Sequence, residues 1–340
     1  MKKFLNKKEI ISVVAVFITV LSIGYITFFT SNYYSVEEPV IFEIKEGESF
    51  TSAAERLLAL EVIPNKTNFR IAAFIYGAET SIRAARYKIP NGLSYLELLD
   101  LFQHGEADFL RSIRVNDGQT IKWLSAKVRR DLNVDSVSFF NLTHDSQFIK
   151  SLGLKVSSLE GYLFPGTYKI YERSSPEEII NIFHDGFKEF WNDTLKLRAE
   201  EIGFTIHQVL TLASIIKGET HLSEEMPRIS GVYHNRLRIG MRLQADPTIQ
   251  YLLPGGWRRL LYEDLRIESP YNTYRYAGLP PGPINNPGQN PILAALYPEE
   301  NKYLYFVADG TGGHKFASTY SEHLKYVREY RRWLKTQQKK

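Results

Sequence analysis

The sequence predicts an α+β protein with one N-terminal transmembrane helix, a small α+β module and a mixed α/β domain. Three observations predict this fold class. An uncharged apolar run covers residues 10–29, and short strand–turn–helix patterns recur over residues 40–132. Helical and alternating patterns then follow one another from residue 159 onward. At 340 residues, the chain has room for an anchor and two or three modest domains.

The composition excludes several classes of function. The formal net charge is only +4, and much of the excess lies at the two chain ends, which argues against nucleic acid as a partner. The chain has no cysteine, which rules out disulfides, thiolate nucleophiles and lipid attachment to cysteine. The eight histidines show no metal-ligand spacing. Aromatic residues make up 13 % of the chain, and core packing explains most of them.

The apolar run from Ile10 to Phe29 is long enough to cross a bilayer, since twenty residues of helix span about 30 Å. Four lysines lie within residues 1–9, and the acidic pair Glu37 and Glu38 follows the run. This asymmetry predicts a cytoplasmic tail over residues 1–9 and the body of the chain on the outer side. A cleaved signal peptide is the alternative, but its apolar region would be shorter.

Three segments within residues 40–132 share one pattern, in which a short alternating strand leads through a Gly-containing turn to a capped apolar helix. The segments begin at Ile41, Tyr87 and Ile113, and their caps are Ser49, Ser94 and Thr120. The pattern fits a small α+β module. The three segments are either a true repeat or unrelated segments with the same local architecture. Residues 133–158 then read as a polar, helical connector.

The stretch from Thr205 onward carries the strongest candidate for catalysis. Thr205 is a plausible helix N-cap, and Val209, Leu212 and Ile216 recur at helical spacing. Glu219 falls on the same face of this helix. A carboxylate among apolar side chains has a raised pKa, which a general acid near neutral pH requires. On periodicity alone, a helix-end Glu turned to solvent is the favoured interpretation.

The remaining patterns predict four further features. Pro176 begins a helix that continues to about Glu201, and residues 241–246 alternate like a strand that stops at a proline. Residues 278–288 are rich in Pro and Gly and predict irregular backbone, and residues 309–313 predict a hairpin turn.

Several long motifs appear in order along the chain. They are Glu160-Gly-Tyr-Leu-Phe-Pro-Gly-Thr-Tyr, Ala213-Ser-Ile-Ile-Lys-Gly-Glu-Thr, Asn235-Arg-Leu-Arg-Ile-Gly-Met-Arg-Leu-Gln-Ala-Asp-Pro-Thr, Ser269-Pro-Tyr-Asn-Thr-Tyr, Gly278-Leu-Pro-Pro-Gly-Pro-Ile and Tyr303-Leu-Tyr-Phe-Val-Ala-Asp-Gly-Thr-Gly-Gly-His-Lys-Phe. With these motifs the chain resembles the endolytic murein transglycosylase (YceG-like) family, from the anchor to the last helix.

The resemblance implies a lytic transglycosylase of nascent peptidoglycan, anchored in the cytoplasmic (inner) membrane with its catalytic domain on the periplasmic face. It implies a LysM-like module over residues 40–132 and a transglycosylase catalytic domain over residues 159–335. No cofactor or metal is implied. The partners are peptidoglycan glycan strands and the membrane, with peptidoglycan synthases as further candidates. The catalytic glutamate of the family matches Glu219.

One carboxyl group is enough for this chemistry. Glu219 would protonate the leaving oxygen and then take a proton from the 6-hydroxyl of the same sugar. The product is a 1,6-anhydro-N-acetylmuramic end, which terminates strand elongation. A two-carboxylate muramidase that uses Glu219 and Asp246 is one alternative. A catalytically silent peptidoglycan-binding scaffold is another, because Lys217 stands where the family commonly has a second acid.

The predicted substrate-binding residues offer the amides, hydroxyls, rings and charges that hold sugars. They are Asn235, Gln244, Asp246, Tyr271, Asn272, Thr273, Tyr274 and His314. Local turn bonding is the competing interpretation for Asn272 and Thr273, and a structural role is the competing one for His314.

Overall fold

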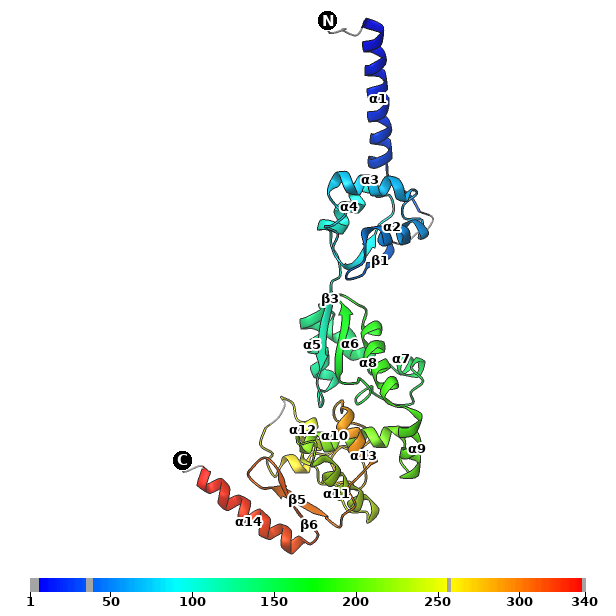
Figure 1. The fold of residues 1–340 in the computed structure, drawn as a ribbon. Helices are drawn as coiled ribbons and strands as arrows, with labels where there is room; N and C mark the ends of the chain where they lie inside the picture. Colours follow the sequence, from blue (N-terminus) through cyan, green and yellow to red (C-terminus); the bar gives the residue numbers. More distant parts are fainter. Residues whose placement is uncertain (1–5, 35–38, 256–257, 338–340) are drawn as a thin grey trace. The chain divides into compact units, whose positions relative to one another are not determined.

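A computed structural model describes residues 6–34, 39–255 and 258–337 (Figure 1). Its contacts divide the chain into two compact units. The first comprises Met1–Arg111 with Tyr171–Arg173, and the second comprises Ser112–Ile170 with Ser174–Lys340. Each unit is described by itself below. The predicted boundaries of the module, connector and catalytic domain stay predictions.

Helix α1 (Lys7–Phe29) begins the first unit, and none of its residues is buried. It starts three residues before the predicted Ile10, because Asn6 and Glu9 form a capping box at its N-terminus. Its 23 residues have a mean hydropathy of 2.4, so it could cross a membrane by length and composition, as a signal sequence also could. Residues 1–5 of the predicted tail, and the acidic pair Glu37 and Glu38, lie outside the described residues.

The rest of the first unit packs three helices against a two-stranded antiparallel sheet. Strand β1 (Val40–Ile44) pairs with β2 (Ala85–Ile89), and the helices are α2 (Phe50–Ala59), α3 (Lys66–Tyr76) and α4 (Tyr95–His104). The predicted strands and caps at Ser49 and Ser94 are confirmed. Helix α3 was not predicted. The sheet and the three helices bury an aromatic core that includes Phe42, Phe69, Tyr87 and Phe102.

Most of strand β3 (Leu110–Val115) and of strand β4 (Gly166–Tyr171) belongs to the second unit, and the two strands form a two-stranded sheet. Helices α5 (Ile121–Leu132), α6 (Ser136–Leu142), α7 (Ser146–Ser151) and α8 (Pro176–Phe190) accompany this sheet. The third predicted strand–turn–helix segment, with its cap at Thr120, therefore lies in the second unit. The predicted connector contributes Phe139 and Ile149 to the same buried core as Leu124 and Phe183.

The remainder of the second unit is organised around helix α10 (Ile206–Glu219). Helices α9 (Asp193–Glu201), α11 (Met226–Arg238), α12 (Asp246–Leu252) and α13 (Gln289–Leu296) all contact it. Its residues 209–216 are all buried, so the helix is covered on every side there and not only along the predicted stripe. The short 3-10 helix η1 (Asp264–Arg266) lies in the loop that follows α12.

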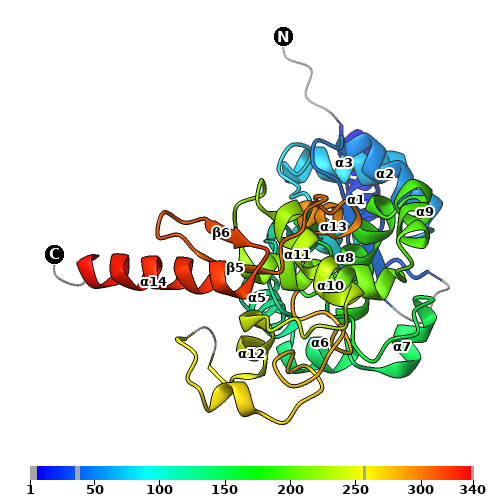
Figure 2. The ribbon, with the colours of Figure 1, turned by 90° about the horizontal axis from the view of Figure 1, so that it is seen from below.

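A β-hairpin and a long helix complete the second unit. Strands β5 (Tyr305–Ala308) and β6 (His314–Ala317) confirm the predicted hairpin. Helix α14 (Tyr320–Gln337) runs beside this hairpin and contacts both strands (Figure 2).

Two sequence predictions in this unit are wrong. The helix predicted from Pro176 to Glu201 is two helices, because α8 ends at Phe190 and Asn192 caps α9. The strand predicted over residues 241–246 is absent from this described segment. Gln244 has a left-handed φ of 48°, which breaks the extended backbone, and Asp246 begins α12 with a proline in its first turn.

Candidate active site

Glu219 is the last residue of α10, whose N-terminus is fixed by a capping box between Thr205 and Gln208. The Glu219 side chain is half-buried, so the carboxyl group is partly screened from water yet open to a ligand. Its Oε1 accepts a hydrogen bond of 2.5 Å from the hydroxyl of Tyr233, a fully buried residue of α11. Two helices thus meet at this carboxyl group.

The surroundings of Glu219 shift its acidity toward neutrality. Burial is the main cause and raises the pKa of Glu219 to about 7. The negative charge of Asp246 also raises this pKa, whereas the Tyr233 hydrogen bond and the positive charge of Arg236 lower it. Burial and the charge of Glu219 raise the pKa of Tyr233 well above its usual value, so Tyr233 remains a hydrogen-bond donor.

Arg236 lies one helical turn after Tyr233 and is also buried. Its guanidinium donates hydrogen bonds to the backbone carbonyls of Leu304, at 2.7 Å, and Leu243, at 2.5 Å. These bonds hold the charge in place without neutralising it. Arg236 therefore favours the ionised form of Glu219 through space.

Asp246 reaches the site because α12 approaches α10 very closely. A Cβ atom added to Gly218 would lie 2.5 Å from Pro247, the residue after Asp246, so only glycine allows this approach. Asp246 is exposed and accepts a hydrogen bond from the hydroxyl of Tyr274. Of the predicted substrate-binding residues, these two lie close enough to Glu219 to act on its charge or share its surroundings.

The loop before Tyr274 is held by its own side chains. Asn272 is fully buried, and its amide donates to the carbonyls of Leu265 and Ile267 while its oxygen accepts from the amide of Tyr274. Thr273 accepts a hydrogen bond of 2.9 Å from the backbone amide of Ala245. Both residues shape the loop that presents Tyr274. Their predicted direct contact with substrate stays a prediction.

The other predicted substrate-binding residues are placed as follows. The Asn235 amide is bonded to the carbonyls of Asn301 and Tyr303. Gln244 is exposed, and Tyr271 is half-buried with its ring against Tyr251. None of these contacts tests their predicted role in binding.

Nδ1 of His314 is hydrogen-bonded to the carboxylate of Glu225 at 2.8 Å, and the backbone amide of His314 donates to the same carboxylate. Its ring meets Phe306 edge-on, and Phe306 meets Tyr233 in the same way. His314 is therefore linked to the Glu219 site through one aromatic ring rather than by a hydrogen bond to Glu219.

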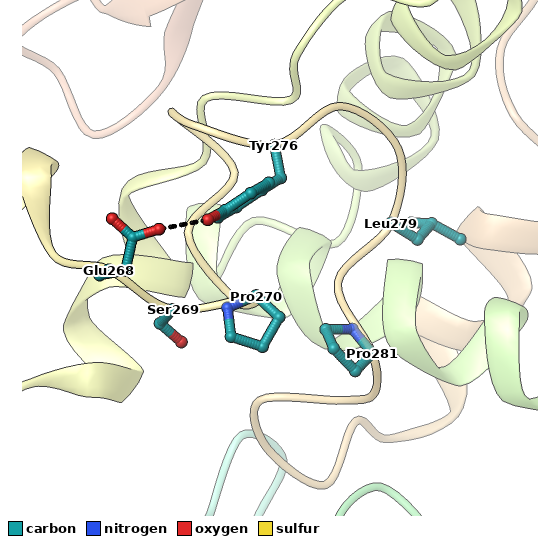
Figure 3. Close-up of a pocket in the computed structure, with 6 residues that line it drawn as sticks. All are labelled: Glu268, Ser269, Pro270, Tyr276, Leu279 and Pro281. Carbon is teal, nitrogen blue, oxygen red and sulfur yellow. Dashed lines mark hydrogen bonds between the residues drawn. The ribbon is translucent and has the colours of Figure 1, made fainter.

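A separate hollow of about 470 Å³ lies in the loops around residues 268–281 (Figure 3). It is lined by Glu268, Ser269, Pro270, Tyr276, Leu279 and Pro281. The hydroxyl of Tyr276 donates a hydrogen bond of 2.5 Å to Glu268, and both residues line the hollow. Neither Glu219 nor Tyr233 lines this hollow, so it is separate from the candidate site at Glu219.

A buried carboxyl group at Glu160 joins two parts of the second unit. It accepts hydrogen bonds from the backbone amide of Ile121, at 3.1 Å, and from the side-chain amide of Asn286, at 3.0 Å. The oxygen of Asn286 accepts from the amides of Gly161 and Leu163. Burial raises the pKa of Glu160 to about 8, although the Ile121 amide opposes this change.

The segment that contains Asn286 also rests on α10. Asn285 donates a hydrogen bond of 2.8 Å to the carbonyl of Ser214, and the amide of Ile284 donates to the Ser214 hydroxyl. Glu160 therefore fixes a segment that lies against α10, the helix that ends at Glu219. Among the described residues, no three His, Cys, Asp or Glu side chains form a group that could hold a metal ion.

Comparison with known proteins identifies the family of this chain. Residues 42–329 match the YceG-like family. The chain belongs to this family. The endolytic murein transglycosylase of Bacillus subtilis (strain 168) is 30 % identical over 306 residues, which are 86 % of this chain and 84 % of that protein. The predicted family and the predicted class of enzyme agree with the name of this relative.

Two further members extend the comparison. The endolytic murein transglycosylase of Streptococcus pneumoniae (strain ATCC BAA-255 / R6) is also 30 % identical, with 75 % of this chain and 52 % of that longer protein covered. The 2.6 Å crystal structure of a YceG-like protein from Listeria monocytogenes has a TM-score of 0.60 at 29 % identity, covering 85 % of this chain and 99 % of that one.

Lys217, at the position where the family resemblance implies a second acid, contacts residues other than Glu219. Its aliphatic stem would touch a Cβ atom added to Gly118, and its amino group lies 3.4 Å from Nδ1 of His221. It is not among the groups that shift the pKa of Glu219. These contacts favour the interpretation that Lys217 is a neighbour of Glu219 and takes no part in the reaction.

We predict that Lys217→Glu changes the pH profile of activity more than its maximal rate. A negative charge near Glu219 raises the pKa of Glu219 further above about 7, so the alkaline limb moves upward. The shift should stay below about one pH unit, because partly exposed charges couple weakly. The rate of glycan cleavage, followed between pH 5 and 8, measures this shift. Activity that appears only in the Lys217→Glu variant would contradict this view and support a silent natural protein.

Tyr233 and Arg236 are the residues that sequence reasoning missed at this site. The signal that could have found them is a tyrosine and an arginine one turn apart on α11. Both are buried, and buried polar groups need partners. Their partners, however, come from other elements and cannot be read from the α11 sequence.

We predict that Tyr233→Phe moves the alkaline limb of activity upward by about one pH unit. The hydroxyl lowers the pKa of Glu219, so its removal raises this pKa above about 7. The maximal rate should fall only moderately, because the ring and its packing remain. Tyr276→Phe, which removes a hydroxyl outside the site, is the control. An alkaline limb at the same pH as in the natural protein, or at a lower pH, would show that Tyr233 does not set the acidity of Glu219.

Proposed function

We propose that this protein is a membrane-anchored endolytic lytic transglycosylase that cleaves the glycan strands of nascent peptidoglycan. The observation that carries the proposal is the Glu219 carboxyl group, half-buried at the end of α10, hydrogen-bonded to Tyr233 and with its pKa raised to about 7. Such a group holds a proton near neutral pH and can also release it. Membership of the YceG-like family supports the choice of substrate.

In the proposed reaction, Glu219 first donates its proton to the glycosidic oxygen as the bond to the anomeric carbon breaks. The Tyr233 hydrogen bond and the Arg236 charge then stabilise the carboxylate that remains. This carboxylate takes the proton of the 6-hydroxyl as that oxygen attacks the anomeric carbon. The product is a 1,6-anhydro-N-acetylmuramic end, no water is consumed, and elongation of the strand stops.

The alternative reaction is hydrolysis with two carboxylates. The observation in its favour is that Asp246 lies near enough to raise the pKa of Glu219. Asp246, however, already accepts the hydroxyl of Tyr274, which suits a fixed electrostatic role. In a lytic transglycosylase, Asp246→Asn should retain cleavage and lower the pKa of Glu219, so the alkaline limb moves downward.

Mass spectrometry of peptidoglycan digested with the full chain tests the proposal. Anhydro ends are expected, reducing ends would indicate a muramidase, and the absence of any product would indicate a silent scaffold. Loss of all activity in Asp246→Asn, together with reducing ends, would replace the proposal with two-carboxylate hydrolysis.

We also propose that α1 is a retained single-pass anchor in the cytoplasmic membrane, with the N-terminus inside and the catalytic domain on the periplasmic face. The length and hydropathy of α1 support this role, and the lysines before its apolar run support the orientation. The LysM-like role of residues 40–132 and the association with peptidoglycan synthases belong to the same proposal. Protease added to spheroplasts should digest the body of the chain, and a protected body would reject this topology.

A further inference from the structure

Helix α3 of the first unit has apolar side chains on two opposite faces. Phe69, Ala72 and Ala73 are buried in the core of the unit. On the other face, Ile71, Phe74 and Ile75 are 45 %, 74 % and 69 % exposed. Their spacing of three and four residues places these three side chains together on one stripe. Apolar side chains on two opposite faces of a helix normally indicate a second partner.

Helix α3, which carries the exposed stripe, lies beside the end of α1. Helix α1 contacts α3 and α4, and Phe28 near its C-terminus packs against the core of the unit. Figure 1 shows α3 lying across the foot of α1. The core of the unit covers the face of α3 that carries Phe69, and the exposed stripe lies on the opposite face, away from this core.

The connection between α1 and the unit is short and bonded. The backbone amide of Asn32 donates to the carbonyl of Leu93, and its side-chain amide donates to the same carbonyl. Tyr34 is buried, and its hydroxyl donates a hydrogen bond of 2.5 Å to the carbonyl of Ile89. Asn32 and Tyr34 both lie within five residues of Phe29. Their hydrogen bonds therefore hold the unit that contains α3 close to the end of α1.

We propose that Ile71, Phe74 and Ile75 insert into the interfacial layer of the bilayer that α1 crosses. This inference rests on the proposed anchor. The bilayer is the occupant that the geometry favours, because a membrane that surrounds α1 as far as Phe29 would meet the neighbouring outer face of α3. Arg70 is exposed beside this stripe, where its guanidinium can meet lipid phosphates.

The absence of cysteine in the natural sequence allows a direct test. The full chain with Phe74→Cys is labelled with an environment-sensitive fluorophore and reconstituted in vesicles that contain anionic phospholipid and lipid-borne quenchers. We expect blue-shifted emission and quenching by a quencher near the headgroups. Ile41→Cys is the matched control, because Ile41 is 54 % exposed on β1. Its label should remain in water.

A second control separates this inference from the anchor. A label at Phe17, within α1, should report lipid if the anchor is correct. If Phe17 reports lipid and Phe74 reports water, the insertion of α3 is wrong and the anchor stands. If both report water, both proposals are wrong. If the label at Phe74 is shielded from water but not quenched by lipid, a protein covers the stripe and the inference is overturned.

Discussion

Replacing Glu219 with Gln is expected to reduce glycan cleavage by about 100- to 10,000-fold, the usual contribution of general acid–base catalysis. Gln keeps the shape of the side chain and can still accept the hydrogen bond from Tyr233, but it has no acidic proton to donate. The measurement is the rate at which anhydro ends appear in digested peptidoglycan, followed by mass spectrometry.

Glu224→Gln is a matched control, since Glu224 is an exposed glutamate five residues further along the chain. It should cleave at the natural rate. The pH profile adds a second check: activity of the natural protein should fall as pH rises through about 7, because Glu219 then loses the proton that it must donate. An unchanged rate for Glu219→Gln would transfer the catalytic role to another residue.

The second large effect is expected at Glu160 and concerns stability. Glu160→Ala leaves the amides of Ile121 and Asn286 without their buried acceptor and opens a cavity. We expect the free energy of unfolding to fall by about 2–4 kcal/mol. Glu160→Gln retains an oxygen that can accept both bonds, so it should fold as the natural protein does. Urea unfolding at pH 5 compares the three proteins.

The same residue predicts a pH dependence with a defined sign. The pKa of Glu160 is about 8 in the folded state and 4.5 in an unperturbed state. The unfolded chain therefore releases this proton at lower pH, and the Glu160 contribution to stability falls as pH rises from about 4.5 to about 8. The slope approaches about 1.4 kcal/mol per pH unit. Glu160→Gln removes this pH dependence, so the variant should become more stable than the natural protein as the pH approaches 8. A constant difference between the two proteins would contradict the raised pKa.

Local features of this fold follow from short stretches of sequence. The caps at Ser49, Ser94, Thr120 and Thr205 form as predicted, because each depends on a backbone amide only three residues away. The β5–β6 hairpin was equally predictable from its turn residues. One prediction failed because proline serves two structures. Pro247 was interpreted as the end of a strand, yet it lies in the first turn of α12.

The sequence by itself determined the family, the candidate anchor, the local caps and Glu219 as the candidate acid. Only the tertiary structure decided what surrounds that acid. Tyr233 donates to it from α11, and Gly218 lets α12 approach until the charge of Asp246 raises its pKa. The physical reason is that helical periodicity gives a side chain its direction along one element. Its partners, its burial and therefore its pKa depend on elements that are distant in the sequence and meet only in the folded chain.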